Sequence, residues 1–214
     1  MTEIWQAIAD PAMEAILAFT IASFLVELTP GPNMTYLAIV SASQGRRAGM
    51  NTVAGVALGL AVIGTAAALG VTAAIQSSDL LYEALRWAGV LFLLYLALDG
   101  WRRSAEPAPE TSGTANGLTD FSRGLIANLL NPKAAVFYVT VLPAFLPHDA
   151  ELADSLLLTA IYVAVATAIH TMIVIAAGSA AALLTHDRQR ILFGRALALL
   201  LALVALWFAI STVR

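Results

Sequence analysis

The sequence contains no cysteine and few charged residues, and both shortages narrow what the chain can be. Without cysteine there is no disulfide, no thiolate nucleophile and no cysteine-ligated metal. Lys, Arg, Asp and Glu together make up 12% of the 214 residues, about half the share of a typical soluble domain. A net charge of −3 is too small to indicate a charged partner, and no nucleic-acid partner is expected.

Several motifs of catalysis and nucleotide binding are also missing. The sequence has no phosphate-binding GxxxxGK[ST], no GxGxxG after a strand, no HExxH and no GxSxG. We therefore expect no enzyme activity, no bound metal or other cofactor, and no ATP hydrolysis by this chain alone. The first residues, MTEIWQAIADPAMEA, lack the basic region and cleavage site of a secretory signal. The first hydrophobic stretch is thus expected to remain in the mature protein.

Apolar residues take the place of the missing charge, at 60% of the chain. They form six segments, each long enough or nearly long enough to cross a bilayer core of about 30 Å as a helix. These segments are about 12–43, 50–76, 80–99, 123–146, 154–184 and 190–212. The pattern predicts an all-α, polytopic membrane protein, with the lipid bilayer as its surroundings and a single transporter domain over 1–214.

A polar linker at 100–122, rich in Pro, Gly, Ser and Thr, divides the chain into two halves of three segments. Arginines gather in alternate loops, which predicts that the first, third and fifth loops are cytoplasmic and both termini periplasmic. These arginines are Arg46, Arg47, Arg102, Arg103, Arg123, Arg188, Arg190 and Arg195. The halves, about 12–99 and 123–212, then have opposite orientations, as in an inverted-topology repeat.

Helix-breaking motifs interrupt the first segment of each half. The first half carries ELTPGPNMTYL at 27–37, and the second carries ANLLNPKAAVFYV at 127–139. Proline lacks a backbone N–H and its ring clashes with the preceding turn, so both motifs are expected to kink or break a helix. A kink that serves packing alone is the simpler interpretation of either motif taken separately.

The depths of the two breaks match. Pro32 lies 11 residues from Ser43 at the inner end of its segment, and Pro132 lies 10 residues from Ser122. At about 1.5 Å per residue, each break lies roughly 15 Å from the inner surface, near the bilayer midplane. Irregular backbone at that depth is tolerated only where it is buried in protein or lines a cavity. Paired interruptions of this kind indicate a transporter's binding site.

The residues around the breaks suit a zwitterion such as an amino acid. Free N–H groups and Lys133 provide positive charge, whereas Glu27 and free carbonyls provide negative charge. We predict a substrate site made of Thr29, Pro30, Gly31, Pro32, Asn33, Asn128, Asn131, Pro132 and Lys133. A structural ion pair between Glu27 and Lys133 is the alternative interpretation of these two charges.

Two titratable residues in the segments are candidates for proton coupling. Glu27 is the first candidate and His170, within AIHTMIV, is the second. A histidine that satisfies one hydrogen bond is the simpler interpretation of His170. Gly55 and Gly59 form a GxxxG motif, which permits close helix approach and favours packing within the chain.

Three stretches carry a resemblance to a known family. TPGPNMTYLAIVSASQGRRAG (29–49), AGVALG (54–59) and RGLIANLLNPKAAVFYVTVLPAFL (123–146) resemble the LysE/RhtB family of bacterial amino-acid exporters. The chain length and the six segments match as well. The resemblance implies export of an amino-acid substrate across the inner membrane, driven by protons. By motif match it carries over the PGPN residues 30–33 and the NPK residues 131–133, and it does not identify the substrate.

The leading hypothesis is thus a proton-coupled exporter of amino acids or their derivatives. A passive small-solute channel and a membrane scaffold subunit are the alternatives. The sequence leaves the oligomeric state open, including a homo-oligomer.

Overall fold

The computed structural model describes residues 11–28, 31–70, 78–103, 117–147, 149–182 and 187–211. Over these residues the chain is helical and contains no strand. The helices are α2 (Pro11–Leu28), α3 (Pro32–Gln44), α4 (Arg46–Ala68), α6 (Asp79–Arg103), α7 (Gly117–Leu129), α8 (Pro132–Val136), η1 (Phe137–Val141), η2 (Leu142–Phe145), α9 (Leu152–Ala182) and α10 (Asp187–Ser211). Of the short elements, η1 is a turn of π-helix and η2 is a 3₁₀ turn.

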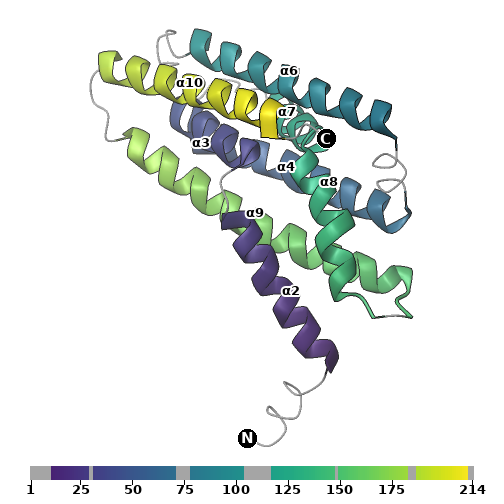
Figure 1. Ribbon diagram of the computed structural model, residues 1–214. Coiled ribbons are helices and arrows are strands. Elements are labelled where there is room, and N and C mark those ends of the chain that lie inside the picture. The colour runs from purple at the N-terminus through teal and green to yellow at the C-terminus, as the bar shows by residue number, and fades with distance from the viewer. Residues whose placement is uncertain are drawn as a thin grey trace, which may run out of the picture.

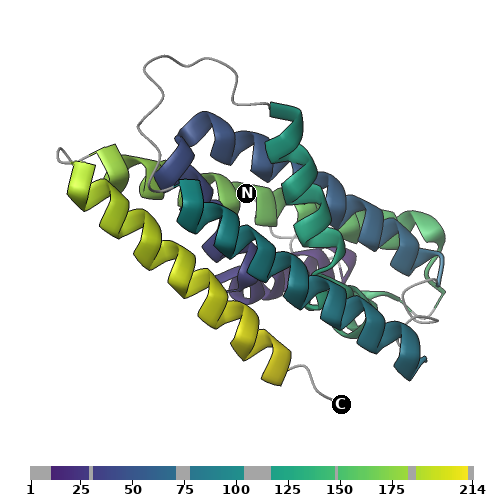
Figure 2. The same ribbon diagram turned by 90° about the horizontal axis from the view of Figure 1, so that it is seen from above.

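The long helices form a bundle in which α6 and α10 lie side by side (Figures 1 and 2). Helices α3 and α4 lie between this pair and α9. Helix α3 packs on both α9 and α10, and α4 packs on α7 and α9. Helix α2 leans away from the bundle in Figure 1 and contacts α9 and η2. Of the elements between α7 and α9, η2 contacts α2, whereas α8 and η1 contact α4.

One end of the bundle carries arginines. Helix α4 begins at Arg46, α6 ends at Arg103, and Arg188 follows the first residue of α10. Figure 1 shows these ends on the same side of the bundle as the end of α9. We name this side the arginine end, and we name the side where α4 ends and α6 and α9 begin the opposite end.

By length and composition, two of the described helices can cross a membrane. They are α4, and α9 over Leu152–Ala180, with mean hydropathies of 1.6 and 2.1. Two helix pairs pass the same test together, Met13–Leu28 with Pro32–Gln44 and Gly117–Leu129 with Lys133–Phe145, bent by 62° and 52°. The described residues thus contain two such helices, or up to four if each bent pair is one span. The expected count of six remains a prediction.

The local sequence explains where the bent pairs break. Pro32 is the first residue of α3 after Gly31, and Pro132 is the first residue of α8 after Asn131. Proline suits the first turn of a helix because its missing N–H would have no partner there. Gly45 separates α3 from α4. Its φ of 92° is a backbone conformation that residues with a Cβ rarely adopt.

Apolar side chains fill the bundle and also cover its outside. One buried cluster includes Phe19, Leu60 and Tyr162, and joins α2, α4, η1 and α9. Large apolar residues are exposed on the outer faces, among them Leu91 at 62% and Leu203 at 63%. An apolar exterior over a packed interior is the distribution expected of helices that face lipid.

Helices α4 and α7 cross at very short distance. A Cβ added at Gly55 would lie 2.0 Å from the carbonyl oxygen of Phe121, and one at Gly124 would lie 2.2 Å from that of Thr52. Further along α4, a Cβ at Gly59 would lie 2.9 Å from Cβ of Asn128. The glycines of the GxxxG motif thus face α7 of the same chain, and this crossing determines where Asn128 lies.

Candidate functional site

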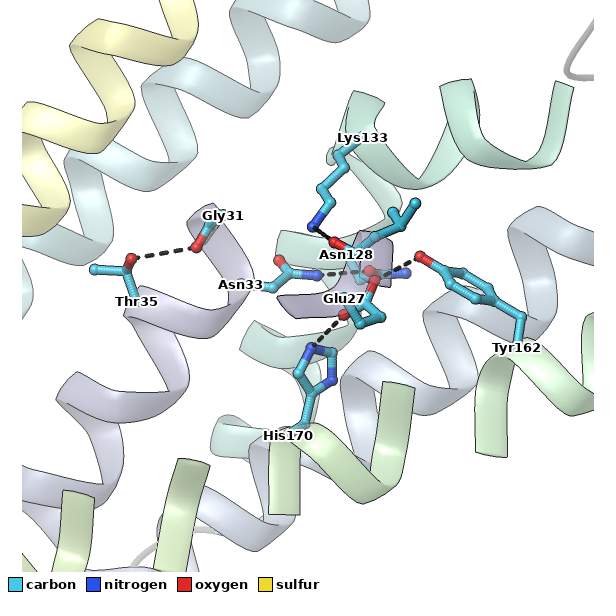
Figure 3. A network of polar contacts seen from close by, with 9 residues as sticks. Glu27, Gly31, Asn33, Thr35, Asn128, Lys133, Tyr162 and His170 are labelled. Carbon is cyan, nitrogen blue, oxygen red and sulfur yellow. Dashed lines mark hydrogen bonds and ion pairs between the residues drawn. The ribbon is translucent and has the colours of Figure 1, made fainter. Parts of the chain in front are cut away.

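The two helix breaks meet in one small cavity near the middle of α9. Seven of the predicted residues line it, together with Met34, Leu60, Ala134 and Tyr162. The seven are Glu27, Gly31, Asn33, Asn128, Asn131, Lys133 and His170. Figure 3 shows Glu27 with the side chains of Lys133, Asn33, Asn128, Tyr162 and His170 around it. Residues far apart in the sequence, such as Asn33 and Asn128, therefore face the same cavity.

Lys133 joins the second break to the first. Its Nζ donates a hydrogen bond of 3.0 Å to the carbonyl oxygen of Val26 (Figure 3). Val26 lies in the last turn of α2, where carbonyls have no partner within the helix and carry partial negative charge. The lysine stem passes Gly31, where an added Cβ would lie 3.5 Å from Cδ of Lys133. The cation thus caps the end of α2 while it borders the cavity.

A pair of amides crosses the cavity. Nδ2 of Asn33 donates a 2.6 Å hydrogen bond to Oδ1 of Asn128, and both residues are buried. Among the described residues, Oδ1 of Asn33 and Nδ2 of Asn128 have no hydrogen-bond partner. Leaving such a group unpaired in the interior costs about 1–3 kcal/mol. This amide pair therefore offers the cavity one acceptor atom and one donor atom that have no partner in the part of the chain that the structure describes.

Asn131 has a different local role. Its side chain caps α8 by accepting a 3.1 Å hydrogen bond from the backbone N–H of Lys133. The carbonyl of Asn131 also accepts from the N–H of Ala134 at 3.1 Å. Because these bonds use the first N–H groups of α8, the contribution of this helix end to the cavity comes mainly from the Lys133 side chain.

Glu27 is held by two side chains of α9. The hydroxyl of Tyr162 donates to Oε1 at 2.6 Å, and Nε2 of His170 lies 3.3 Å from Oε2. All three residues are buried. Tyr162 and His170 are eight residues, or about two turns, apart on one face of α9, and the carboxylate of Glu27 lies between them.

The remaining predicted residues lie around this cavity or outside the described part of the chain. Thr29 and Pro30 fall between 28 and 31 and are not among the described residues. Pro32 is buried at the start of α3, and Pro132 begins α8. Sequence reasoning missed Tyr162, although its spacing of eight residues from His170 on one helical face is a usable signal.

The cavity is very small. Its volume is about 10 Å³, roughly the room that one water molecule needs. A larger molecule can enter only if the helices around it move apart. Among the described residues, no three His, Asp or Glu side chains lie close enough together to hold a metal ion.

Comparison with known proteins identifies the family. The family model for LysE type translocators matches residues 24–212. A homoserine/homoserine lactone efflux protein of Salmonella typhimurium is 30% identical over 143 residues, which cover 66% of this chain and 69% of that protein. A leucine efflux protein of an Enterobacter species is 32% identical over 136 residues, or 62% of this chain and 64% of that protein.

A third relative covers more of the chain. It is an uncharacterised membrane protein of Pseudomonas aeruginosa, 29% identical over 184 residues, which are 82% of this chain and 85% of that protein. No solved structure matches the chain. The family match spans most of the sequence and confirms the resemblance carried by the PGPN and NPK motifs. This chain belongs to the LysE type translocator family.

Proposed function

We propose that this chain is a secondary active exporter of amino acids or their derivatives across the bacterial inner membrane, coupled to the proton gradient by antiport. The observation that carries the proposal is the cavity where Glu27, Lys133 and the Asn33–Asn128 pair meet at two helix breaks. Relatives named for homoserine and leucine efflux support amino acids as the substrate class.

The cavity has the groups that a zwitterion requires. The Lys133 ammonium and the free Nδ2 of Asn128 suit a substrate carboxylate, which would replace Val26 as the partner of the lysine. The free Oδ1 of Asn33 and the Glu27 carboxylate suit a substrate ammonium. Leu60, Met34 and Ala134 are left to contact the side chain of the amino acid.

The bent helix pairs support a six-span arrangement with two inverted repeats. In this arrangement α2 with α3, and α7 with α8 to η2, are broken spans, while α4, α6, α9 and α10 are continuous. The arginine end faces the cytoplasm because lysine and arginine are retained on that side. The cavity then lies near the midplane, since α9 has ten residues before Tyr162 and twelve after His170.

Glu27 carries the proton in this proposal. The groups that face it are Tyr162 and His170 of α9, and Lys133, which borders the same cavity. When the carboxylate takes a proton, its attraction for a cation and for the Tyr162 hydroxyl weakens. Proton binding and release of a substrate ammonium at this site are thereby linked.

Export itself is tested in cells fed with dipeptides that contain leucine or homoserine. Cells that make the protein should accumulate less of the free amino acid inside than cells that do not, and an uncoupler should abolish the difference. A difference that persists with the uncoupler would favour a passive channel. If the level of no amino acid changes across a panel of such dipeptides, the proposed function is wrong.

Glu27→Gln is expected to abolish the pH dependence of transport. Glutamine has nearly the same shape and can still accept the hydrogen bond from Tyr162, but it cannot carry a proton. The rate of export from membrane vesicles is measured over a series of external pH values. Glu151→Gln, at an exposed position before α9, is the matched control and should leave the profile unchanged. An unaltered profile for Glu27→Gln would transfer the proton role to His170.

A further inference from the structure

An aromatic cluster lies between the Glu27 cavity and the opposite end of the bundle. It consists of Phe19, Phe137, Tyr138, Phe145 and Tyr162. The rings of Phe137 and Tyr162 are stacked with centroids 3.8 Å apart, and Tyr138 meets Tyr162 edge-on at 5.4 Å. Phe19 bridges Phe137 and Phe145, with centroids 5.9 and 5.5 Å away. These rings fill the space between α2, η1, η2 and the first half of α9.

Buried hydroxyls without partners lie around this cluster. Ser23, Tyr138 and Thr159 are at most 5% exposed, and none of their hydroxyls has a hydrogen-bond partner among the described residues. Helical Ser and Thr residues often donate to the carbonyl four residues earlier, as Thr20 and Thr140 do at 2.7 Å. Since Ser23 and Thr159 lack even this bond, their burial costs free energy that an apolar side chain would not cost.

The three hydroxyls come from different helices but surround the same pair of rings. On α2, Ser23 shares a face with Phe19, which contacts Phe137, and with Glu27, which binds Tyr162. Thr159 precedes Tyr162 by one turn of α9. Thr159 and Tyr138 both pack on Gly64, where an added Cβ would lie 2.4 Å from Cγ2 of Thr159 and 2.7 Å from Cζ of Tyr138. Thr159 and Tyr138 therefore lie together beside the stacked pair, and Ser23 lies between the two residues of α2 that contact it.

Tyr162 lies between the Glu27 cavity and the three buried hydroxyls around the aromatic cluster. Its hydroxyl binds Glu27 in the cavity, and its ring stacks on Phe137 in the cluster. The bond to Glu27 and the stack on Phe137 are thus two contacts that hold this ring in place. If the ring turned away from Phe137, the space left would be bordered by Tyr138 and Thr159 and would face Ser23.

We propose that Ser23, Tyr138 and Thr159 form an exit subsite that binds the polar head group of the substrate after it leaves the Glu27 cavity. Tyr162 is the gate between the cavity and this exit subsite. The ligand class is the ammonium and carboxylate of an amino acid with its water, because hydroxyls can donate to one and accept from the other. The ligand class in this inference rests on the proposed function. The opening of a path past Tyr162 does not.

The absence of cysteine from the chain makes the opening directly measurable. Thr159→Cys and Ser23→Cys each introduce the sole thiol, which is treated with a charged, membrane-impermeant methanethiosulfonate in right-side-out and inside-out vesicles. Leu157→Cys is the matched control, because Leu157 is two residues away on α9 and 50% exposed on the outer face. Mass spectrometry gives the labelled fraction with time.

We expect Thr159→Cys and Ser23→Cys to react at least about tenfold faster than Leu157→Cys in right-side-out vesicles, because only the thiolate in water reacts. Adding Tyr162→Phe should increase the rate, since the bond to Glu27 is lost. Reaction no faster than the control, or only in inside-out vesicles, would overturn the exit subsite.

A transport measurement separates this inference from the proposed function. Thr159→Val keeps the shape of threonine without its hydroxyl and should slow export several-fold, whereas Thr159→Ser should restore most of the rate. Equal export by the valine variant and wild type would contradict a role in binding the head group. If Thr159→Cys is labelled fast but the protein exports no amino acid, the result would support the opening of a water-filled path. The same result would contradict an amino acid as the substrate.

Discussion

Lys133→Ala is expected to lower amino-acid export at least about tenfold while the protein still inserts in the membrane, because a hydrogen bond to a charged group contributes about 1.5–3 kcal/mol. The substitution removes the cation that borders the cavity and leaves the Val26 carbonyl without its 3.0 Å hydrogen bond. It also removes the group proposed to bind the substrate carboxylate. Export is measured as initial rate per amount of protein in the membrane fraction.

Two further variants show what the Lys133→Ala result means. Lys133→Arg keeps the charge but replaces a point charge on a flexible stem with a planar fork, so we expect partial activity. Arg47→Ala removes an exposed cation at the arginine end and should change the rate less than about twofold. Normal export by Lys133→Ala at wild-type protein levels would eliminate the role assigned to this lysine.

The sequence was sufficient to predict an all-helical chain and the residues where two helices end. Pro32 and Pro132 act locally, because a proline sets the backbone and removes a donor wherever it lies. Charged and amide residues inside apolar segments are equally visible, since burying them without a function is costly. For these reasons Glu27, Asn33 and Lys133 could be selected before their common cavity was known.

The partners of these residues were not predictable in the same way. That Tyr162 binds Glu27, and that Lys133 reaches Val26, depends on how α9 and α8 are rotated against α2. A single sequence contains no such information about rotation or depth across different helices. Asn131 illustrates the same limit, because the sequence placed it at the cavity but did not show that its side chain also caps α8.

The expectation of six spans shows where composition is a weak guide. Helix α6 has 25 residues but includes charges near both ends, and the apolar part of α10, Ile191–Trp207, is short for a span. Neither is selected by length and composition over the described residues. Their place in the bundle, packed on each other and on α3, is what supports their counting as spans.

Gly55→Ala is expected to destabilise the protein by about 1–3 kcal/mol, the usual cost of forcing extra atoms into a packed interior. The new Cβ would lie 2.0 Å from the Phe121 carbonyl oxygen and 2.8 Å from the Leu125 nitrogen. Both are backbone atoms, which no rotamer change can move away. Thermal unfolding of the detergent-solubilised protein measures the loss. The control is Ala54→Val, which adds more atoms but at an exposed position of the same helix.

Gly55→Ala is also expected to reduce export by more than the loss of stability explains. The reason is that α4 and α7 must separate to accommodate the new methyl group. Asn128 lies on α7 against Gly59, so a shift of α7 moves its amide relative to Asn33 and lengthens their 2.6 Å hydrogen bond. Export per folded molecule, measured well below the unfolding temperature, separates this effect from instability. Wild-type export per folded molecule in Gly55→Ala would show that the crossing stabilises the bundle without positioning the site.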